Sequence, residues 1–415
     1  MNRSRRVRAG VAALVAGCCL SSAVFGAGFQ LYNEGSAEAL GLGAAVTARR
    51  DLLSNTWYNP AALAGSEKAG LSLGLTLVAP TYTYDAGGPG GDQELESAIH
   101  KVPHLNYVHP LSERWTAMLA VTVPYGLGTE WDKAYLRSLY TTRTDFLTRP
   151  VMGIPQEINL MAPHIMPSIG YRVTDKWSVA AGVSLVYAEF YLQNILHPGA
   201  AAALGTDEME FEGDGMGLGY SLSTHYQFNP EWAVGLSFRS HVDLTLEGEN
   251  DTRAMGRPDI EGDLRLPPSL ALGVANTSFE RWTLTADVVW TGWSSYDKLL
   301  IMNDDNNTVM LNSEKDWDNV YSYRLGAEYQ LSEAWALRGG YVYDESPVPD
   351  RTRGLELPCN DRHMFSAGVG YTSGTWGVDV SYCFLLLDDG DAGESLGYIG
   401  DFSDANAHLF GFSFR

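Results

Sequence analysis

The amino-acid sequence predicts an all-β membrane protein, a 14-stranded antiparallel transmembrane β-barrel that is plugged by a small N-terminal hatch. Three observations predict this fold. Beyond the extreme N-terminus, the chain has no run of about 20 apolar residues, which a membrane helix needs. Apolar and polar residues alternate over many segments, and their average gives a mild mean hydropathy of −0.13. A short turn that ends in tryptophan is repeated six times.

The charge balance excludes one broad class of function. The 415 residues include 28 Lys and Arg against 50 Asp and Glu, which gives a formal net charge of −22. Proteins that bind nucleic acids need a basic face to meet the phosphates. We therefore expect no nucleic-acid partner.

Residues 1–26 have the features of a secretory signal peptide. A basic start is followed by a short apolar stretch from Val11 to Leu20 and then by small residues. A cut after Gly26 would leave a mature chain that begins at Ala27. The alternative is a lipoprotein signal in which Cys18 is lipidated. The expected division is a signal peptide at 1–26, a hatch at 27–66 and a barrel at 67–415.

The repeated turn sets the number of strands. It ends at Trp115, Trp177, Trp232, Trp282, Trp335 and Trp376. Six such turns join twelve strands, while one strand precedes the first pair near residues 71–77 and one follows the last at residues 402–415. The total of fourteen is even, as in bacterial barrels formed by one chain. Phe410, Phe412 and Phe414 share one face of the last strand, and Arg415 stands where an aromatic final residue is usual.

Side chains on one face of each strand suit a lipid contact. After Trp232, for example, Val234, Leu236 and Phe238 alternate with small or polar residues. Long polar segments join the other ends of the hairpins, at 84–100, 127–157, 191–212, 297–317 and 385–401. Short turns on one side and long loops on the other are typical of the Gram-negative outer membrane. A soluble β-sandwich is the alternative, but it does not usually repeat a Trp turn six times.

Residues 27–66 do not alternate and hold an Asn59-Pro60-Ala61 turn. They could form a flexible tail or a plug. Apolar residues such as Phe29, Leu31 and Trp57 favour a plug, because a flexible tail is poor in such side chains. A barrel that is filled in this way would not be a wide aqueous pore.

Several motifs together carry a family resemblance. They are Ala27-Gly28-Phe29-Gln30-Leu31, Gly41-Leu42-Gly43, Asn59-Pro60-Ala61, Tyr125-Gly126-Leu127 with Glu130, and Asp344 with Ser346-Pro347-Val348-Pro349, Pro358 and Asp361-Arg362. In this order they resemble the long-chain fatty-acid outer-membrane transporters of the OMPP1/FadL/TodX family. The resemblance covers nearly the whole mature chain.

The resemblance implies passive uptake of hydrophobic molecules, either long-chain fatty acids or aromatic and aliphatic hydrocarbons. The ligand would be captured outside and pass to a pocket near Phe29 and Leu31. It would leave sideways through a gap beside a kinked third strand. Asn59, Pro60, Ala61, Pro124 and Gly126 are the expected hatch and gate residues. Pro124 marks either a bent strand or a simple strand end, because it lacks a backbone donor.

The expected capture surface lies in residues 132–157. Leu136, Leu139, Tyr140 and Phe146 make this segment unusually apolar for an external loop. It either forms a capture groove, with residues 191–212 opposite, or packs into a small core of its own.

The resemblance leaves the substrate class open. Fatty-acid members hold the carboxylate with basic side chains, whereas the matching positions near Asn194 and Leu300 are not basic. Lys298, Arg239 and Arg338 are the remaining candidates, and the alternative is that they pair with acids in the lumen. The missing basic contacts lean toward uncharged hydrocarbons.

No metal, cofactor or catalytic site is expected. The neighbours Ser240 and His241 point to opposite faces of a strand, so they cannot pair within it. An outer-membrane lipid-active enzyme and a general porin are the alternative functions. Expected partners are the hydrophobic solute, outer-membrane lipid and lipopolysaccharide, and detergent in vitro, with a monomeric barrel. Cys359 and Cys383 could pair or remain free thiols.

Overall fold

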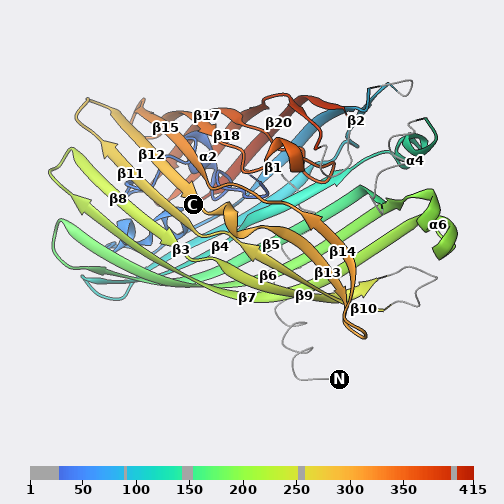
Figure 1. Ribbon diagram of the computed structural model, residues 1–415. Coiled ribbons are helices and arrows are strands. Elements are labelled where there is room, and N and C mark those ends of the chain that lie inside the picture. Colours follow the sequence, from blue (N-terminus) through green and yellow to red (C-terminus); the bar gives the residue numbers. More distant parts are fainter. Residues whose placement is uncertain (1–27, 88–90, 143–152, 251–257, 394–399) are drawn as a thin grey trace.

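The computed structural model describes residues 28–87, 91–142, 153–250, 258–393 and 400–415. The signal peptide expected at 1–26 lies outside these residues. The described strands form one antiparallel barrel of 14 strands, with hairpin turns at one end and long loops at the other (Figure 1). The fold class predicted from the sequence is confirmed.

Most spans of the wall are single strands. They are β1 (Gly70–Asp85), β3 (His100–Pro110), β4 (Trp115–Glu130), β5 (Gly153–Arg172), β6 (Trp177–Leu196), β7 (Glu208–Gln227), β16 (Trp335–Asp344), β17 (Arg362–Ser373), β18 (Trp376–Leu387) and β20 (Asp401–Phe414). The short strands β2 (Asp92–Glu94) and β19 (Gly390–Asp391) extend the wall at the long-loop end, where they pair with β1 and β20.

The other spans are interrupted partway. They are β8 (Trp232–Arg239) with β9 (Val242–Asn250), β10 (Asp259–Leu266) with β11 (Ser269–Asn276), β12 (Trp282–Thr291) with β13 (Lys298–Asn303), and β14 (Thr308–Glu314) with β15 (Val320–Gln330). The interruptions bring non-strand residues, among them Pro267 and Trp293, to the inner wall.

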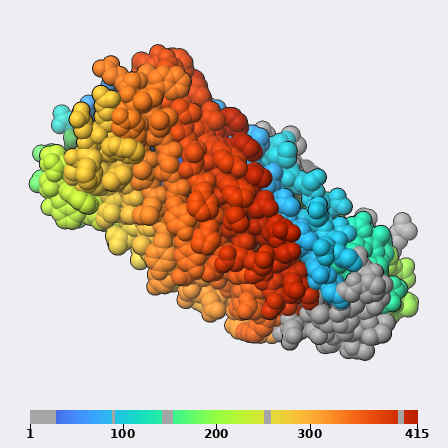
Figure 2. All heavy atoms as spheres, turned by 90° about the horizontal axis from the view of Figure 1, so that it is seen from above, coloured from blue at the N-terminus to red at the C-terminus, as the bar shows by residue number. Residues whose placement is uncertain are grey.

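The first and last strands close the barrel. β1 pairs antiparallel with β3 on one side and with β20 on the other, from Leu73 opposite Phe414 to Asp85 opposite Asp401. Figure 2 shows the red C-terminal strands lying directly against the blue N-terminal ones. The first and last strands therefore present no open edge to lipid, which cannot supply hydrogen bonds.

The tryptophans of the repeated turn form a ring on the outer surface. Each begins a strand, and each side chain is 43–46% exposed: Trp115, Trp177, Trp232, Trp282, Trp335 and Trp376. A tyrosine stands opposite most of them, with ring centroids 4.5 Å apart for Trp115 and Tyr171 and 4.7 Å apart for Trp335 and Tyr371. This ring is the aromatic girdle that barrel proteins place at the membrane interface.

Helices are short. Among the described residues, none is both long enough and apolar enough to cross a membrane. The N-terminal segment holds α2 (Ala37–Gly41), α3 (Asn55–Tyr58) and the 3₁₀ turn η1 (Pro60–Leu63). The remaining connections hold α4 (Lys133–Thr142), α6 (Pro198–Leu204), η3 (Trp293–Ser295) and η4 (Asp350–Thr352).

Residues 28–66 lie inside the ring of strands, and most of them are buried (blue in Figure 1). The helix α2 is bound to the last strands, because the Ala37 N–H donates to Ser413 Oγ at 2.9 Å and Ser381 Oγ donates to the Ala37 carbonyl at 2.6 Å. On another side of the barrel, the Thr47 N–H donates to Asp287 Oδ2 at 2.9 Å. The segment is therefore bound to several strands of the inner wall.

Small residues let the segment approach the wall. A Cβ atom added to Gly340 on β16 would lie 2.2 Å from the Gly43 backbone nitrogen, which is far inside contact distance. The neighbouring Gly339 has room, because its nearest atom would be 4.0 Å away. The inward glycine is thus needed for close contact, while its outward neighbour is not.

We expect Gly340→Ala to lower the free energy of unfolding by about 1–3 kcal/mol, because the methyl group overpacks this contact. Gly339→Ala is the matched control and should change it by no more than about 0.5 kcal/mol. Urea unfolding in lipid vesicles measures both. Equal effects of the two substitutions would contradict the close contact between Gly340 and the segment.

Candidate functional site

The wall is interrupted where β4 leaves β3. The ladder between these strands ends at Leu105 opposite Val121, although β3 continues to pair with β1 as far as His100 opposite Val78. On its other side β4 stays paired with β5 through an irregularity between Thr122 and Tyr125. From Thr122 to Thr129, no described backbone hydrogen bond joins β4 to β3. Pro124 lies within this stretch, so the structure places it inside β4, at the irregularity, rather than at a strand end.

The start of the N-terminal segment pairs with this released edge. The Leu31 N–H donates to the Pro124 carbonyl at 2.7 Å, and the Gly126 N–H donates to the Phe29 carbonyl at 2.9 Å. Gln30 forms an antiparallel bridge with Tyr125. A side chain at Gly126 would begin 3.2 Å from Leu31 Cδ1. Residues 29–31 of the N-terminal segment are therefore in direct contact with the expected gate residues Pro124 and Gly126.

Phe29 extends from this contact into an aromatic cluster. Its ring centroid lies 4.7 Å from that of Trp293, 5.6 Å from Tyr296 and 5.7 Å from Trp317. The turn η3 interrupts the ninth span and directs Trp293 inward, where it is fully buried. Edge-to-face contacts of this kind add about 0.5–1.5 kcal/mol each to the burial of the rings.

The cluster borders a small cavity of about 30 Å³. Apolar walls come from Phe29, Leu127, Ile158, Leu299 and Leu357. One wall is the connection between β16 and β17, which is tied to the end of β4: Thr129 Oγ1 donates to the Glu356 carbonyl at 3.2 Å and Trp131 Nε1 to the Leu355 carbonyl at 2.9 Å. The cavity therefore lies between the hatch terminus, β4 and this connection.

One ion pair lies in the cavity wall. Lys315 and Glu356 are both largely buried, at 4% and 9% exposure, and Lys315 Nζ contacts Glu356 Oε1. Lys315 follows β14 directly and is outside any strand. Strand patterns in the sequence did not indicate Lys315 as a basic contact, because this residue lies in a connection and not in a strand.

The three predicted basic residues lie elsewhere. Lys298 is exposed at the start of β13 and does not line this cavity. Arg239 lines a second small cavity of about 20 Å³ beside Gln30 and Leu31, where its guanidinium stacks 4.2 Å from the centre of the Trp57 ring and donates to the Trp57 carbonyl. Arg239 therefore binds the N-terminal segment.

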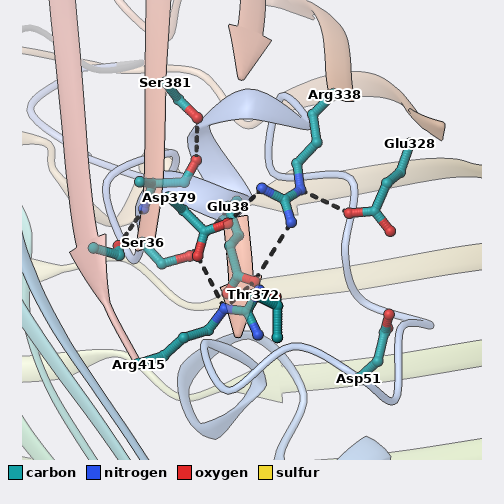
Figure 3. A network of polar contacts seen from close by, with 12 residues as sticks. Ser36, Glu38, Asp51, Glu328, Arg338, Thr372, Asp379, Ser381 and Arg415 are labelled. Carbon is teal, nitrogen blue, oxygen red and sulfur yellow. Dashed lines mark hydrogen bonds and ion pairs between the residues drawn. The ribbon is translucent and has the colours of Figure 1, made fainter. Parts of the chain in front are cut away.

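Arg338 is the centre of an ion-pair network (Figure 3). Its guanidinium meets Glu328 and Asp379 at 2.7 Å each and Glu38 of α2 at 3.6 Å. Arg415, the last residue, meets Glu38 at 3.2 Å and Asp379 at 3.0 Å. Burial raises the pKa of the Glu38 carboxyl to about 7, and the Asp379 carboxylate acts in the same direction. The network holds α2 to the wall.

The Asn59-Pro60-Ala61 turn is a second anchor of the segment. Asn59 Nδ2 donates to the Thr47 carbonyl at 2.7 Å, which folds the segment onto itself. The Ala61 N–H donates to Ser223 Oγ at 3.1 Å, and Ser178 Oγ donates to the Ala61 carbonyl at 2.6 Å. Pro60 begins η1, where its missing N–H costs no hydrogen bond.

The apolar side chains of α4 face inward. Leu136, Leu139 and Tyr140 are buried at 0–4% exposure, and Tyr140 donates to the Ile195 carbonyl at 3.2 Å. Arg137 pairs with Asp207 at 2.7 Å next to α6. The segment therefore packs part of its apolar surface inward, and its role in capture stays a prediction. Phe146 lies outside the described residues.

Cys359 and Cys383 are both buried and form no disulfide. This finding decides between the two alternatives that the sequence left open.

We expect Arg338→Met to lower the free energy of unfolding by about 3–5 kcal/mol, because it leaves buried carboxylates without their partner. The matched control is Arg351→Gln at a half-exposed pair with Glu314, which should cost no more than about 1 kcal/mol. Urea unfolding measures both, and protease cleavage within residues 28–66 should rise in the Arg338 variant alone. A cost at Arg338 as small as at Arg351 would contradict the network.

Comparisons with known proteins agree with this architecture. A family model described as "Outer membrane protein transport protein (OMPP1/FadL/TodX)" matches residues 17–415. The "Long-chain fatty acid transport protein" of Escherichia coli O6:H1 is 26% identical and is aligned over 97% of this chain and 96% of its own. "Outer membrane protein P1" of Haemophilus influenzae is 25% identical over 68% of this chain and 65% of its own.

Solved structures share the fold. A Pseudomonas aeruginosa FadL homologue superposes with a TM-score of 0.80 at 18% identity and covers 93% of this chain and 98% of its own. The toluene transporter TodX of P. putida gives a TM-score of 0.70 at 17% identity, with 92% and 98% covered. The match of the family model over nearly the whole chain decides the identity. The chain belongs to the OMPP1/FadL/TodX family of transport proteins of the Gram-negative outer membrane.

Proposed function

We propose that this protein carries hydrophobic small molecules passively across the outer membrane. The solute enters from the long-loop end, occupies the cavity beside Phe29 and leaves sideways between β3 and β4. Relatives named as fatty-acid transporters and structural neighbours that are toluene transporters support hydrophobic cargo. Residues 27–66 act as the hatch.

The observation that carries the proposal is the interruption between β3 and β4, where Thr122–Thr129 of β4 are not bonded to β3. We call this interruption the seam. Beyond Val121, the released edge of β4 is bonded to residues 29–31 and not to β3. Each such hydrogen bond contributes only about 0.5–1.5 kcal/mol. A ligand that packs against Phe29 and enlarges the small cavity would loosen the same short segment. Binding in the cavity and opening of the seam are coupled in this way.

Two other functions are less well supported. A general porin needs an open lumen, whereas residues 28–66 are largely buried inside this one. An outer-membrane enzyme would be unlike the named relatives, which are transport proteins. We infer that the protein has no catalytic activity, acts as a monomer, and touches lipid and lipopolysaccharide with its outer surface. Liposomes separate these functions: sugar influx would favour a porin, and ester hydrolysis would favour an enzyme.

Uptake assays test the function directly. Cells with and without the gene are supplied with labelled toluene and labelled oleate at equal concentrations. We expect the gene to raise the uptake of at least one of the two, and the ratio tells hydrocarbon from fatty-acid transport. If the gene changes neither, the proposed function is wrong.

Phe29→Ala should reduce uptake by about tenfold, because a lost aromatic contact of about 1.4 kcal/mol corresponds to this factor in occupancy. The matched control is Phe279→Ala in a short turn, where the side chain is 60% exposed and touches no cavity described above. Initial rates of toluene or oleate uptake measure both variants. Equal rates for the two variants would rule out a role of Phe29 in the pathway.

Deletion of residues 27–31 should reduce uptake further, since it removes both the pocket wall and the partner of the β4 edge. The amount of folded barrel in the membrane, measured by its migration before and after heating, is the control for assembly. Normal uptake with normal assembly would contradict a functional hatch terminus.

A further inference from the structure

The polar end of the cavity beside Phe29 holds an ion pair together with buried polar atoms that have no hydrogen-bond partner among the described residues. Among the residues that the structure describes, Lys315 and Glu356 are the ones with full charges in the cavity wall, and they pair with each other. Their charges cancel, so the cavity carries no net charge from its own wall. A ligand in this cavity meets a dipole and not a free cation.

Half of the Glu356 carboxylate remains available. Oε1 is held by Lys315, whereas Oε2 is buried and has no hydrogen-bond partner among the described residues. Oε2 lies against Gly354, where an added Cβ would be 2.1 Å away and would force the carboxylate to move. Both residues line the cavity.

A donor is also available in the cavity wall. The indole N–H of Trp317, whose ring lines the cavity, is buried and has no partner among the residues the structure describes. A buried polar group without a partner costs about 1–3 kcal/mol. A ligand that supplies both a donor for Glu356 and an acceptor for Trp317 would recover part of this cost.

The chemistry of these groups discriminates among ligands. A carboxylate would place a second negative charge beside Glu356, and an ammonium group would place a second positive charge beside Lys315. A pure hydrocarbon would leave Oε2 and the indole without partners. A hydroxyl group adds no charge, donates one hydrogen bond and accepts others.

We propose that the Lys315–Glu356 pair makes this cavity selective for hydrophobic molecules that carry a hydroxyl group, such as alkylphenols, over the matching carboxylates. Glu356 Oε2 accepts the hydroxyl hydrogen while Lys315 keeps Oε1, and the aromatic cluster around Phe29 holds the ring. The proposal rests on the proposed transport function and names the ligand class of the same cavity.

Three ligands with one methyl-substituted ring test the selectivity. Isothermal titration calorimetry of the full-length protein in lipid nanodiscs compares the dissociation constants of toluene, p-cresol and p-toluate at pH 7.5. We expect p-cresol to bind about tenfold tighter than toluene, the size of one hydrogen bond to a charged group, and at least about tenfold tighter than p-toluate. Tighter binding of p-toluate than of p-cresol would overturn the proposal.

Glu356→Gln tests whether the Lys315–Glu356 pair causes the preference for p-cresol over p-toluate. The variant leaves the Lys315 charge without its partner, so the ratio of p-cresol affinity to p-toluate affinity should fall by about tenfold or more. Glu314→Gln is the matched control, since Glu314 is exposed on β14 and does not line the cavity, and its ratio should stay within about twofold of the parent ratio. An unchanged ratio in Glu356→Gln would also overturn the proposal.

A second variant covers the case in which Glu356→Gln does not assemble. Replacing the pair together, as Lys315→Met with Glu356→Leu, leaves no buried charge and conserves volume. This variant should bind toluene as the parent does and lose the preference for p-cresol over toluene. A retained preference would contradict the role of the pair.

The outcomes separate this proposal from the transport function. If none of the three ligands binds and neither toluene nor oleate is taken up, the transport function itself is wrong. If toluene or oleate is taken up normally but p-cresol is bound no better than p-toluate, only the hydroxyl selectivity is wrong.

Discussion

A membrane barrel must pair its backbone hydrogen-bonding groups, because lipid offers no partners. In this protein one interruption of the wall lies where the ladder between β3 and β4 ends at Leu105 and Val121. There the chain supplies its own substitute, a short strand-like segment at residues 29–31. Because the substitute belongs to the N-terminal segment, the integrity of the wall depends on the position of that segment. A movement of the N-terminal segment therefore changes both the seam and the cavity beside Phe29.

The rest of the inner wall is adapted to hold this segment. Glycine at position 340 and serine at 381 and 413 leave room and offer hydroxyl partners, where larger residues would collide with the backbone of α2 and its neighbours. The ion pairs of Arg338 and Arg415 add charge complementarity at the end of the last strand. Arg415 cannot reach Glu38 until β20 is in place between β18 and β1. The last residue thus links closure of the barrel to seating of the segment.

The sequence predicted the features that are set locally by the membrane. Trp115 and its five counterparts had to lie at the interface, so their spacing gave the strand number, and alternation gave the outer face. The polar residues of the cavity could not be predicted in this way. Lys315 and Glu356 come from non-strand connections whose paths depend on tertiary contacts, such as the bond from Trp131 to Leu355. Neither periodicity nor spacing in one sequence indicates that two such residues meet.

A neutral ion pair also suits a transporter better than an isolated cation does. A carboxylate bound to a free buried lysine would have to give up a strong, poorly screened attraction before it could leave through the apolar seam. With Glu356 in place, Lys315 is already satisfied, and a departing ligand loses at most one or two ordinary hydrogen bonds. The cavity can then order a ligand without trapping it. Binding strength comes mainly from the apolar and aromatic walls. These walls are about as apolar as the lipid that receives the ligand, so leaving them costs little free energy.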